Sequence, residues 1–193
     1  MYKQPRVSIL VPYHDMKNAE FFLKRNIDSI MSQTFTDYEI VLTKDGSMAE
    51  NTNAGIKRAR GELIKIMYLD DYFLHQLSLQ QIVEAFDSEV DWMMVGTDDN
   101  TEPCFTHDIE TGNNRLGSPS ALIFRNDRPI LFDEYLSWLL DCDLYKRMYK
   151  RFGEPKILEG RYIGIGKGDH QMTNILTDEE KLAEHKYIKQ KYE

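Results

Sequence analysis

Short apolar runs typical of strands alternate with helical spacing along the first half of the chain. The β-rich runs predict strands at residues 7–11, 38–43 and 63–69. Apolar residues at helical spacing predict helices at residues 19–33 and 53–60. This order of strand, helix and strand indicates a parallel sheet, and such sheets bind ligands beyond the carboxyl ends of their strands. We therefore expect functional loops at residues 12–15 and 45–47, where the first two strands end.

The second half of the chain has similar elements in a less regular order. Ser78 and Thr177 are each followed three residues later by Gln or Glu, which predicts a helix start at both places. Another helix is predicted from about residue 134 to residue 152, before Gly153 and Pro155. Strands are predicted at residues 92–95, 121–124 and 157–165. The polar segment 97–117 predicts a loop long enough to contact substrate.

Length and composition narrow the class of protein. A chain of 193 residues with 41% hydrophobic and 29% charged residues is typical of one globular domain. Its net charge of −8 argues against nucleic-acid binding, and an acidic protein that holds a phosphorylated ligand is expected to need a cation. No apolar stretch approaches the ~20 residues of a membrane-spanning helix, and the first residues do not resemble a signal peptide. We predict a cytoplasmic protein without an integral membrane segment, in which Cys104 and Cys142 are free thiols.

Several motifs, in this order, resemble family 2 glycosyltransferases of the GT-A superfamily. The run from Val7 to Asp15 is similar to the opening strand and loop of that family, and Ser29 to Phe35 is similar to its "S-I-x-x-Q-T" motif. Asp45-Gly46-Ser47 follows the second strand, where the family has "D-D-G-S". The resemblance implies a single α/β domain with the Rossmann-like GT-A fold, in which helices flank a mostly parallel central sheet.

The resemblance also implies a site for a nucleotide. Asp45 corresponds to the residue that accepts a hydrogen bond from the base, and His14 stands where the family has a Tyr beside the base. Lys167, between two glycines, is expected to reach the diphosphate. The nucleotide-binding residues are expected to be Pro12, Tyr13, His14, Asp45, Asn53 and Lys167.

A metal motif is expected where the third strand ends. The family's "D-x-D-D" aligns with Tyr68-Leu69-Asp70-Asp71, so the first acid is replaced and Asp70 is kept. A carboxylate at this point suits Mn²⁺ or Mg²⁺. GT-A enzymes often have a late His on the metal, which implies this role for His170. The alternatives are an exposed acidic turn at residues 70–71 and a structural histidine in a surface loop.

The catalytic group is expected on the long helix of the second half. Leu140-Asp141-Cys142-Asp143 is similar to the family's "E-D-x-D", which implies that Asp141 is the general base. A solvated helix face is the alternative for Asp141 and Asp143. Contacts with the donor sugar or the acceptor are expected from Asp71, Ser118 and Trp138.

These residues together predict an inverting glycosyltransferase. Its donor is a nucleotide diphosphate sugar, with a UDP-sugar favoured, and its acceptor is a hydroxyl group of a glycan, a lipid-linked molecule or another compound. We expect a nucleotide-binding half at about residues 1–100, an acceptor and catalytic half at about 101–176, and a C-terminal helix at 177–193. The alternative is a non-catalytic nucleotide-sugar-binding or scaffold module of the same fold, because family acids are replaced at Lys44, Tyr68 and Leu140.

Overall fold

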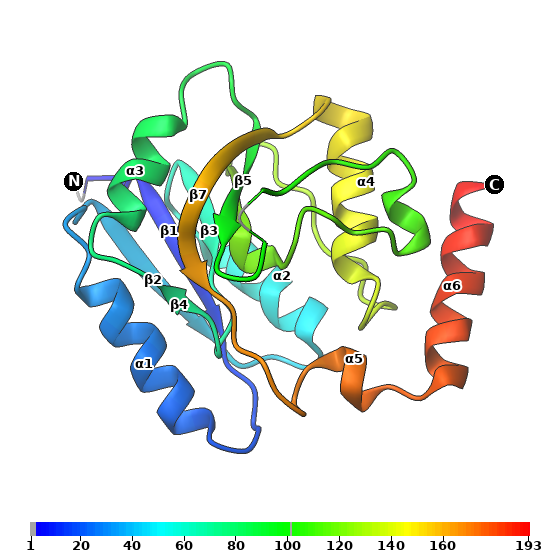
Figure 1. The fold of residues 1–193 in the computed structure, drawn as a ribbon. Coiled ribbons are helices and arrows are strands. Elements are labelled where there is room, and N and C mark those ends of the chain that lie inside the picture. The colour runs from blue at the N-terminus through cyan, green and yellow to red at the C-terminus, as the bar shows by residue number, and fades with distance from the viewer. Residues whose placement is uncertain (1–2, 101) are drawn as a thin grey trace.

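The computed structural model describes residues 3–100 and 102–193, which form one seven-stranded sheet flanked by helices (Figure 1). The strands are β1 (Val7–Pro12), β2 (Tyr38–Thr43), β3 (Leu63–Ile66), β4 (Tyr72–Phe73), β5 (Trp92–Thr97), β6 (Leu122–Arg125) and β7 (Lys156–Gly164). The α-helices are α1 (Ala19–Met31), α2 (Met48–Arg58), α3 (Ser78–Ala85), α4 (Leu140–Phe152), α5 (Met172–Ile175) and α6 (Asp178–Tyr192). Two 3₁₀ helices, η1 (Ile109–Thr111) and η2 (Pro119–Ala121), lie in the loops of the second half.

The strand order is β2-β1-β3-β6-β5-β7-β4. β1 pairs in parallel with β2 and β3, and β5 pairs in parallel with β7. β6 runs antiparallel to both of its neighbours, and β4 runs antiparallel to β7. Five strands therefore point the same way, which confirms the predicted fold class. Since Pro12 of β1 pairs with Thr43 of β2, the loops after these strands begin at the same edge of the sheet.

The hydrophobic core lies on both faces of the central strands. Every residue of β1, β3 and β5 is buried, because helices and loops cover both sides of these strands. β2, at the edge of the sheet, is mostly half-buried. Each fully buried aliphatic side chain contributes about 1.5–3 kcal/mol to folding, so the central strands form a rigid base for the loops at their carboxyl ends.

Two helix starts differ from the prediction. α2 begins at Met48 rather than at about residue 53, because Ser47 forms a capping box with Glu50: the Ser47 Oγ accepts from the Glu50 N–H at 3.3 Å, and Glu50 Oε2 accepts from the Ser47 N–H at 2.7 Å. α4 begins at Leu140, not at about residue 134. The helix at residues 53–60 was therefore predicted too short, and the helix at 134–152 too long.

The two predicted caps had opposite outcomes. Thr177 caps α6 as predicted, with Thr177 Oγ1 accepting from the Glu180 N–H at 3.3 Å. The capping box at Ser78 was wrong: the residue before α3 is Leu77, and the Ser78 hydroxyl donates to the main-chain oxygen of Tyr162 at 3.0 Å. A tertiary bond to β7 has replaced the local one.

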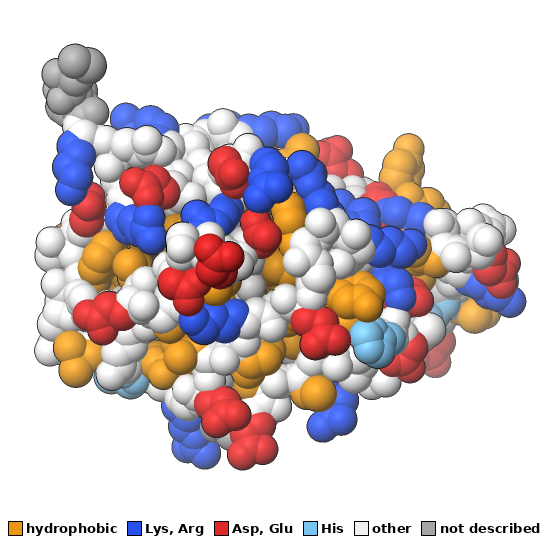
Figure 2. All heavy atoms as spheres, turned by 90° about the horizontal axis from the view of Figure 1, so that it is seen from above, with side chains coloured by type: hydrophobic (Ala, Val, Ile, Leu, Met, Phe, Trp, Pro, Cys, Tyr) orange, Lys and Arg blue, Asp and Glu red, His pale blue; other side chains and the backbone are white. Residues whose placement is uncertain are grey.

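The face at the amino ends of the strands has charges of both signs (Figure 2). Lys156 pairs with Asp87 at 2.9 Å, and Arg128 pairs with Asp91 at 2.8 Å. Cys104 and Cys142 are free thiols, as predicted. Among the residues that the model describes, no helix has the length and apolar character needed to cross a membrane.

The C-terminal helix is held to α4 through Asp143, which is 0% exposed. One oxygen of this carboxylate accepts from the Tyr192 hydroxyl and pairs with Lys191, each at 2.7 Å. The other oxygen accepts from Arg147 Nε at 2.8 Å. A buried carboxylate with three partners is stable only while all of them remain.

We expect Asp143→Ala to lower the free energy of unfolding by about 2–4 kcal/mol, because Arg147 and Tyr192 lose the carboxylate that they share between α4 and α6 and Lys191 keeps only its pair with Asp133. Urea unfolding would measure the change. The matched control is Asp28→Ala on α1, which removes an exposed ion pair with Lys24 and should change the free energy by less than about 0.5 kcal/mol. Equal effects of the two substitutions would contradict this prediction.

Candidate active site

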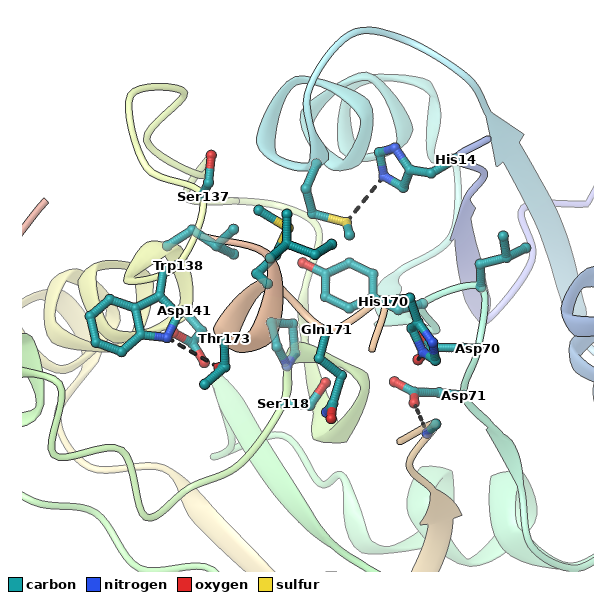
Figure 3. A pocket seen from close by; sticks show the side chains of 18 of the residues that line it. His14, Asp70, Asp71, Ser118, Ser137, Trp138, Asp141, His170, Gln171 and Thr173 are labelled. Carbon is teal, nitrogen blue, oxygen red and sulfur yellow. Dashed lines mark hydrogen bonds and ion pairs between the residues drawn. The ribbon is translucent and has the colours of Figure 1, made fainter. Parts of the chain in front are cut away.

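A cavity of about 580 Å³ lies at the carboxyl ends of the parallel strands. Its walls are the loop after β1, the start of α2, residues 68–71, the start of α4 and residues 165–175. Seven of the twelve site residues predicted from the sequence line it: His14, Asp70, Asp71, Ser118, Trp138, Asp141 and His170. Figure 3 shows Asp70, Asp71 and His170 on one side of the cavity and Asp141 and Trp138 on the other.

Asp70 and His170 are in contact on one side of the cavity, although they are far apart in sequence. Nε2 of His170 lies 2.8 Å from Oδ2 of Asp70, and the two side chains are 20% and 18% exposed. Phe22 of α1 packs against the imidazole, with 5.2 Å between the ring centroids. Arg25 donates to the main-chain oxygen of Asp70, and its guanidinium lies 4.3 Å from the centre of the Tyr72 ring. The pair is thus supported from α1 and open to the cavity.

The geometry of this pair fits a divalent cation. Adjacent ligands of an octahedral ion bound at about 2.0–2.2 Å are about 3 Å apart, close to the spacing of the Asp70 oxygen and the His170 nitrogen. Among the described residues, no group of three or more His, Cys, Asp or Glu side chains is arranged to hold a metal. An ion here would have two protein ligands and would need further oxygens from a ligand or from water.

Asp71 lies behind the pair and is only 3% exposed. Its Oδ1 accepts from the Gly166 N–H at 2.8 Å. Burial raises the pKa of the Asp71 carboxyl, and the neighbouring Asp70 raises it further. The charge of Lys65 on β3 acts in the opposite direction and lowers the pKa of Asp71. Burial lowers the pKa of Lys65 itself. Asp71 therefore belongs to a buried network that supports Asp70.

Gly166 lies in close contact with Asp70. A Cβ atom at residue 166 would lie 2.6 Å from both the main-chain oxygen and the Cβ of Asp70, and it would also overlap the carboxylate. Only glycine lets the segment after β7 pass this close to Asp70. The same glycine donates to Asp71, so it fixes the His170 segment against both carboxylates.

Asp141 lies in the first turn of α4, on the other side of the cavity. Oδ2 accepts from Asn114 Nδ2 at 2.8 Å, and Oδ1 accepts from the Cys142 N–H at 2.7 Å. Burial raises the pKa of the Asp141 carboxyl in spite of these bonds. Asp143 points toward α6 instead, because residues two apart on a helix are about 200° apart around its axis. Of these two acids on α4, Asp141 is the one that lines the cavity.

His14 lies near the start of α2. Burial lowers the pKa of its imidazole, which is therefore neutral at pH 7. Nε2 lies 3.2 Å from Sδ of Met48, another residue of the cavity wall. A neutral ring beside a thioether forms a flat, weakly polar surface that suits a nucleotide base.

Asn51 joins the two loops that follow β1 and β2, and the sequence analysis missed it. Its Nδ2 donates to the main-chain oxygen of Tyr13 at 2.7 Å, and its Oδ1 accepts from the Asp45 N–H at 3.2 Å. The side chain is fully buried. A correct assignment of the Ser47 cap would have placed Asn51 in the first turn of α2, next to both loops.

The other five predicted residues lie outside the cavity lining. Pro12 ends β1, and the Tyr13 ring lies under Lys44, 4.9 Å from Nζ. The Asp45 carboxylate pairs with Arg58 of α2 at 3.0 Å.

Asn53 and Lys167 make other contacts. Asn53 is buried, and its amide bonds the main-chain N–H and oxygen of Phe132 at 2.8 and 3.0 Å. Lys167 is exposed, with Nζ 3.9 Å from Asp99. Nucleotide contacts of these two residues therefore remain predictions, with Asn53 placed where it fixes the loop before α4.

No protein-family model matches the chain. In sequence it is similar to the uncharacterized glycosyltransferase EpsJ of Bacillus subtilis (strain 168), with 31% identity over 114 residues. The match covers 45% of this chain and 32% of EpsJ, so the chain corresponds to about a third of that relative's length.

Solved structures share the fold. S. aureus TarS 1–349 in complex with UDP-GlcNAc superposes with a TM-score of 0.68 at 18% identity, covering 95% of this chain and 65% of that one. The mannosyltransferase PcManGT from Pyrobaculum calidifontis, in complex with GDP-Man and Mn²⁺, gives a TM-score of 0.62 at 13% identity, covering 87% and 59%. The resemblance to glycosyltransferases stated from the motifs is confirmed by the similarity to EpsJ, and the chain shares the GT-A fold of the solved structures.

We expect Gly166→Ala to weaken Mn²⁺-dependent binding of UDP by about 10- to 100-fold, because the added methyl group displaces Asp70 from His170. Calorimetric titration with and without Mn²⁺ would measure it. Gly55→Ala, inside α2, is the matched control. Its added Cβ would make an ordinary 3.4 Å contact with Leu10 of β1, and Mn²⁺-dependent binding of UDP should be retained. Normal Mn²⁺-dependent binding by the Gly166 variant would contradict the placement of the metal.

Proposed function

We propose that the chain is an inverting glycosyltransferase that transfers a sugar from a nucleotide diphosphate donor to a hydroxyl group. The observation that supports this most is the shared cavity: Asp70 and His170 form one wall and Asp141 another (Figure 3). A group that holds a leaving diphosphate and a base that activates the acceptor must face the same anomeric carbon. The GT-A fold and the similarity to EpsJ support the same reaction class.

The charge of the cavity wall supports a divalent cation, Mn²⁺ or Mg²⁺. Its described lining contains the carboxylates of Asp15, Asp70, Asp71 and Asp141, and it contains neither Lys nor Arg. A diphosphate would be repelled by these carboxylates without a cation between them. Asp70 and His170 would hold the ion. When bound, it would neutralise the charge that develops on the departing diphosphate.

A UDP-sugar is the favoured donor. The base would lie between the loop after β1 and the start of α2, where His14 and Met48 form a flat wall. Asp45 follows β2 at the same edge, and Asn51 fixes its main chain. TarS binds UDP-GlcNAc and PcManGT binds GDP-Man, so both classes of donor have precedent in this fold.

Asp141 would act as the general base. Its carboxylate would take the proton of the acceptor hydroxyl while that oxygen bonds to the anomeric carbon and the bond to the diphosphate breaks. One carboxylate is sufficient for this inversion. Ser118 and Trp138 line the cavity near Asp141 and would contact the donor sugar or the acceptor, which is a glycan, a lipid-linked molecule or another hydroxyl compound.

A non-catalytic nucleotide-sugar-binding module is the second candidate. It is favoured by the loss of family acids at Lys44, Tyr68 and Leu140. Such a module would bind the donor with its metal but would show no turnover for a substitution of Asp141 to lower. Turnover therefore separates the two candidates.

We expect Asp70→Asn to abolish Mn²⁺-dependent binding of UDP-GlcNAc, because the amide replaces the charged ligand of the cation. Calorimetry of both proteins, in Mn²⁺ and in a chelator, would measure it. If Asp70→Asn bound UDP-GlcNAc in Mn²⁺ as tightly as the wild type does, the metal site would be refuted. GDP binding at least as tightly as UDP in the same assay would overturn the assignment of the base.

We expect Asp141→Asn to retain UDP-GlcNAc binding and to lower the rate of UDP release by about 10²- to 10⁴-fold, the usual contribution of a general base. Burial raises the pKa of Asp141, so wild-type turnover should fall with decreasing pH at a higher pH than for an exposed carboxylate, as the base becomes protonated. UDP release from UDP-GlcNAc, measured against pH, tests both points. If Asp143→Asn abolishes turnover in folded protein while Asp141→Asn is mild, the base has been assigned to the wrong residue.

A further inference from the structure

Glu184 of α6 contacts the turn that leads into α4. One carboxylate oxygen, Oε1, accepts from the N–H groups of Ser137 at 2.8 Å and Trp138 at 3.2 Å. The other, Oε2, accepts from those of Trp138 at 3.0 Å and Leu139 at 2.8 Å. Three consecutive main-chain donors thus converge on a single side chain from 45 or more residues away in sequence.

These donors lie just before α4: the N–H groups of Ser137 and Trp138 precede the helix, and that of Leu139 belongs to the residue at its N-terminal boundary. Leu139 precedes α4 and has no side chain able to cap it, and no side-chain cap is formed there. An anion at this end is also favoured by the helix dipole. Glu184 therefore fixes, from another helix, the main chain that ends two residues before Asp141.

The same face of α6 surrounds Trp138. The ring of His185 lies edge-on to the indole, with 5.3 Å between centroids, and Lys181 Nζ lies 5.7 Å from the indole centre. The indole N–H donates to Thr173 Oγ1 at 3.2 Å, and Lys181 donates to the main-chain oxygen of Thr173 at 2.8 Å. Thr173 follows His170 by three residues. α6 is therefore connected both to the wall with Asp141 and to the segment with His170.

We infer that Glu184 is a positioning residue: it fixes the 137–139 turn and so places Trp138 and the Asp141 carboxylate in the cavity. The catalytic part of this inference rests on the proposed function. Loss of the carboxylate should leave the Asp70–His170 pair in place, because neither residue bonds Glu184 among the described contacts and Lys181 keeps its own bond to Thr173. Donor binding and turnover should therefore respond differently.

The test compares Glu184→Ala and Glu184→Gln with wild type, using UDP-GlcNAc and Mn²⁺. We expect the dissociation constant of UDP-GlcNAc to stay within about 3-fold, while UDP release falls about 10- to 100-fold in the alanine variant, since small misplacements of a reacting group have effects of this size. The amide oxygen in Glu184→Gln can still accept from two of the three main-chain N–H groups, so this variant should release UDP faster than Glu184→Ala. Tyr192→Phe is the matched control, because it weakens α6 docking at Asp143 without touching the turn.

Tryptophan fluorescence tests the positioning without any turnover. Subtracting the spectra of matched Trp138→Phe proteins isolates the indole of residue 138 from buried Trp92. In Glu184→Ala, this signal should be quenched more readily by acrylamide, whereas in Tyr192→Phe it should not change. A wild type that neither binds nor hydrolyses UDP-GlcNAc would count against the proposed function, and the quenching would still decide on Glu184. Unchanged quenching, or equal loss of donor binding and turnover, would overturn the inference.

Discussion

The desolvation of carboxylates is the constraint on which the arrangement of this molecule depends. Asp71 and Asp143 are buried and Asp141 is half-buried, within two adjoining parts of the fold, and each needs hydrogen bonds or opposite charge to remain there. Asp143 has both, from Arg147, Lys191 and Tyr192. Within the described part of the chain, Asp141 accepts from an amide and a main-chain N–H and pairs with no cation, and burial raises its pKa. Strong pairing at Asp143 fixes the two helices, and incomplete pairing leaves Asp141 with a raised pKa in the cavity lining.

The carboxylates on the Asp70 side of the cavity are compensated differently from Asp141. Asp71 is compensated from below by Lys65, which is itself buried and donates to the main-chain oxygens of Ile66 and Ser120. Arg25 donates to the main chain of Asp70 and leaves the carboxylate for His170. Both cations act from behind the wall rather than in the cavity. The anionic character of the open surface is thus preserved, and this surface is suited to a cation rather than directly to a phosphate.

The fold could be predicted from the sequence because it follows from the local order of strands and helices, and the acids that line the cavity were predicted through their motifs. Asp70 lies four residues after the end of the buried strand β3, at the edge where the parallel strands end. Asp141 was identified by its motif, because the predicted start of its helix at about residue 134 was wrong. Asn114 and Glu184 could not be predicted, because their bonds join elements whose contact is decided by tertiary packing. Asn53 shows the converse: its motif was visible, but its amide bonds the main chain of Phe132 in the interior.

The cost of desolvating carboxylates also bears on the three positions at which this chain lacks an acid of the family. Lys44, at the first acid of "D-D-G-S", pairs with Asp15 at 2.8 Å, so it reduces the negative charge beside the cavity. Leu140 is buried in the core, where a glutamate would be a further desolvated charge next to Asp141. Tyr68 fills part of the wall with a neutral ring, and burial raises the pKa of its hydroxyl. Each replacement removes a carboxylate near one that is kept. Because repulsion between carboxylates at short range raises their pKa values, a leucine in place of a glutamate at residue 140 leaves Asp141 better able to stay ionised. The substitutions are therefore compatible with a working site that uses one acid at the metal and one as the base.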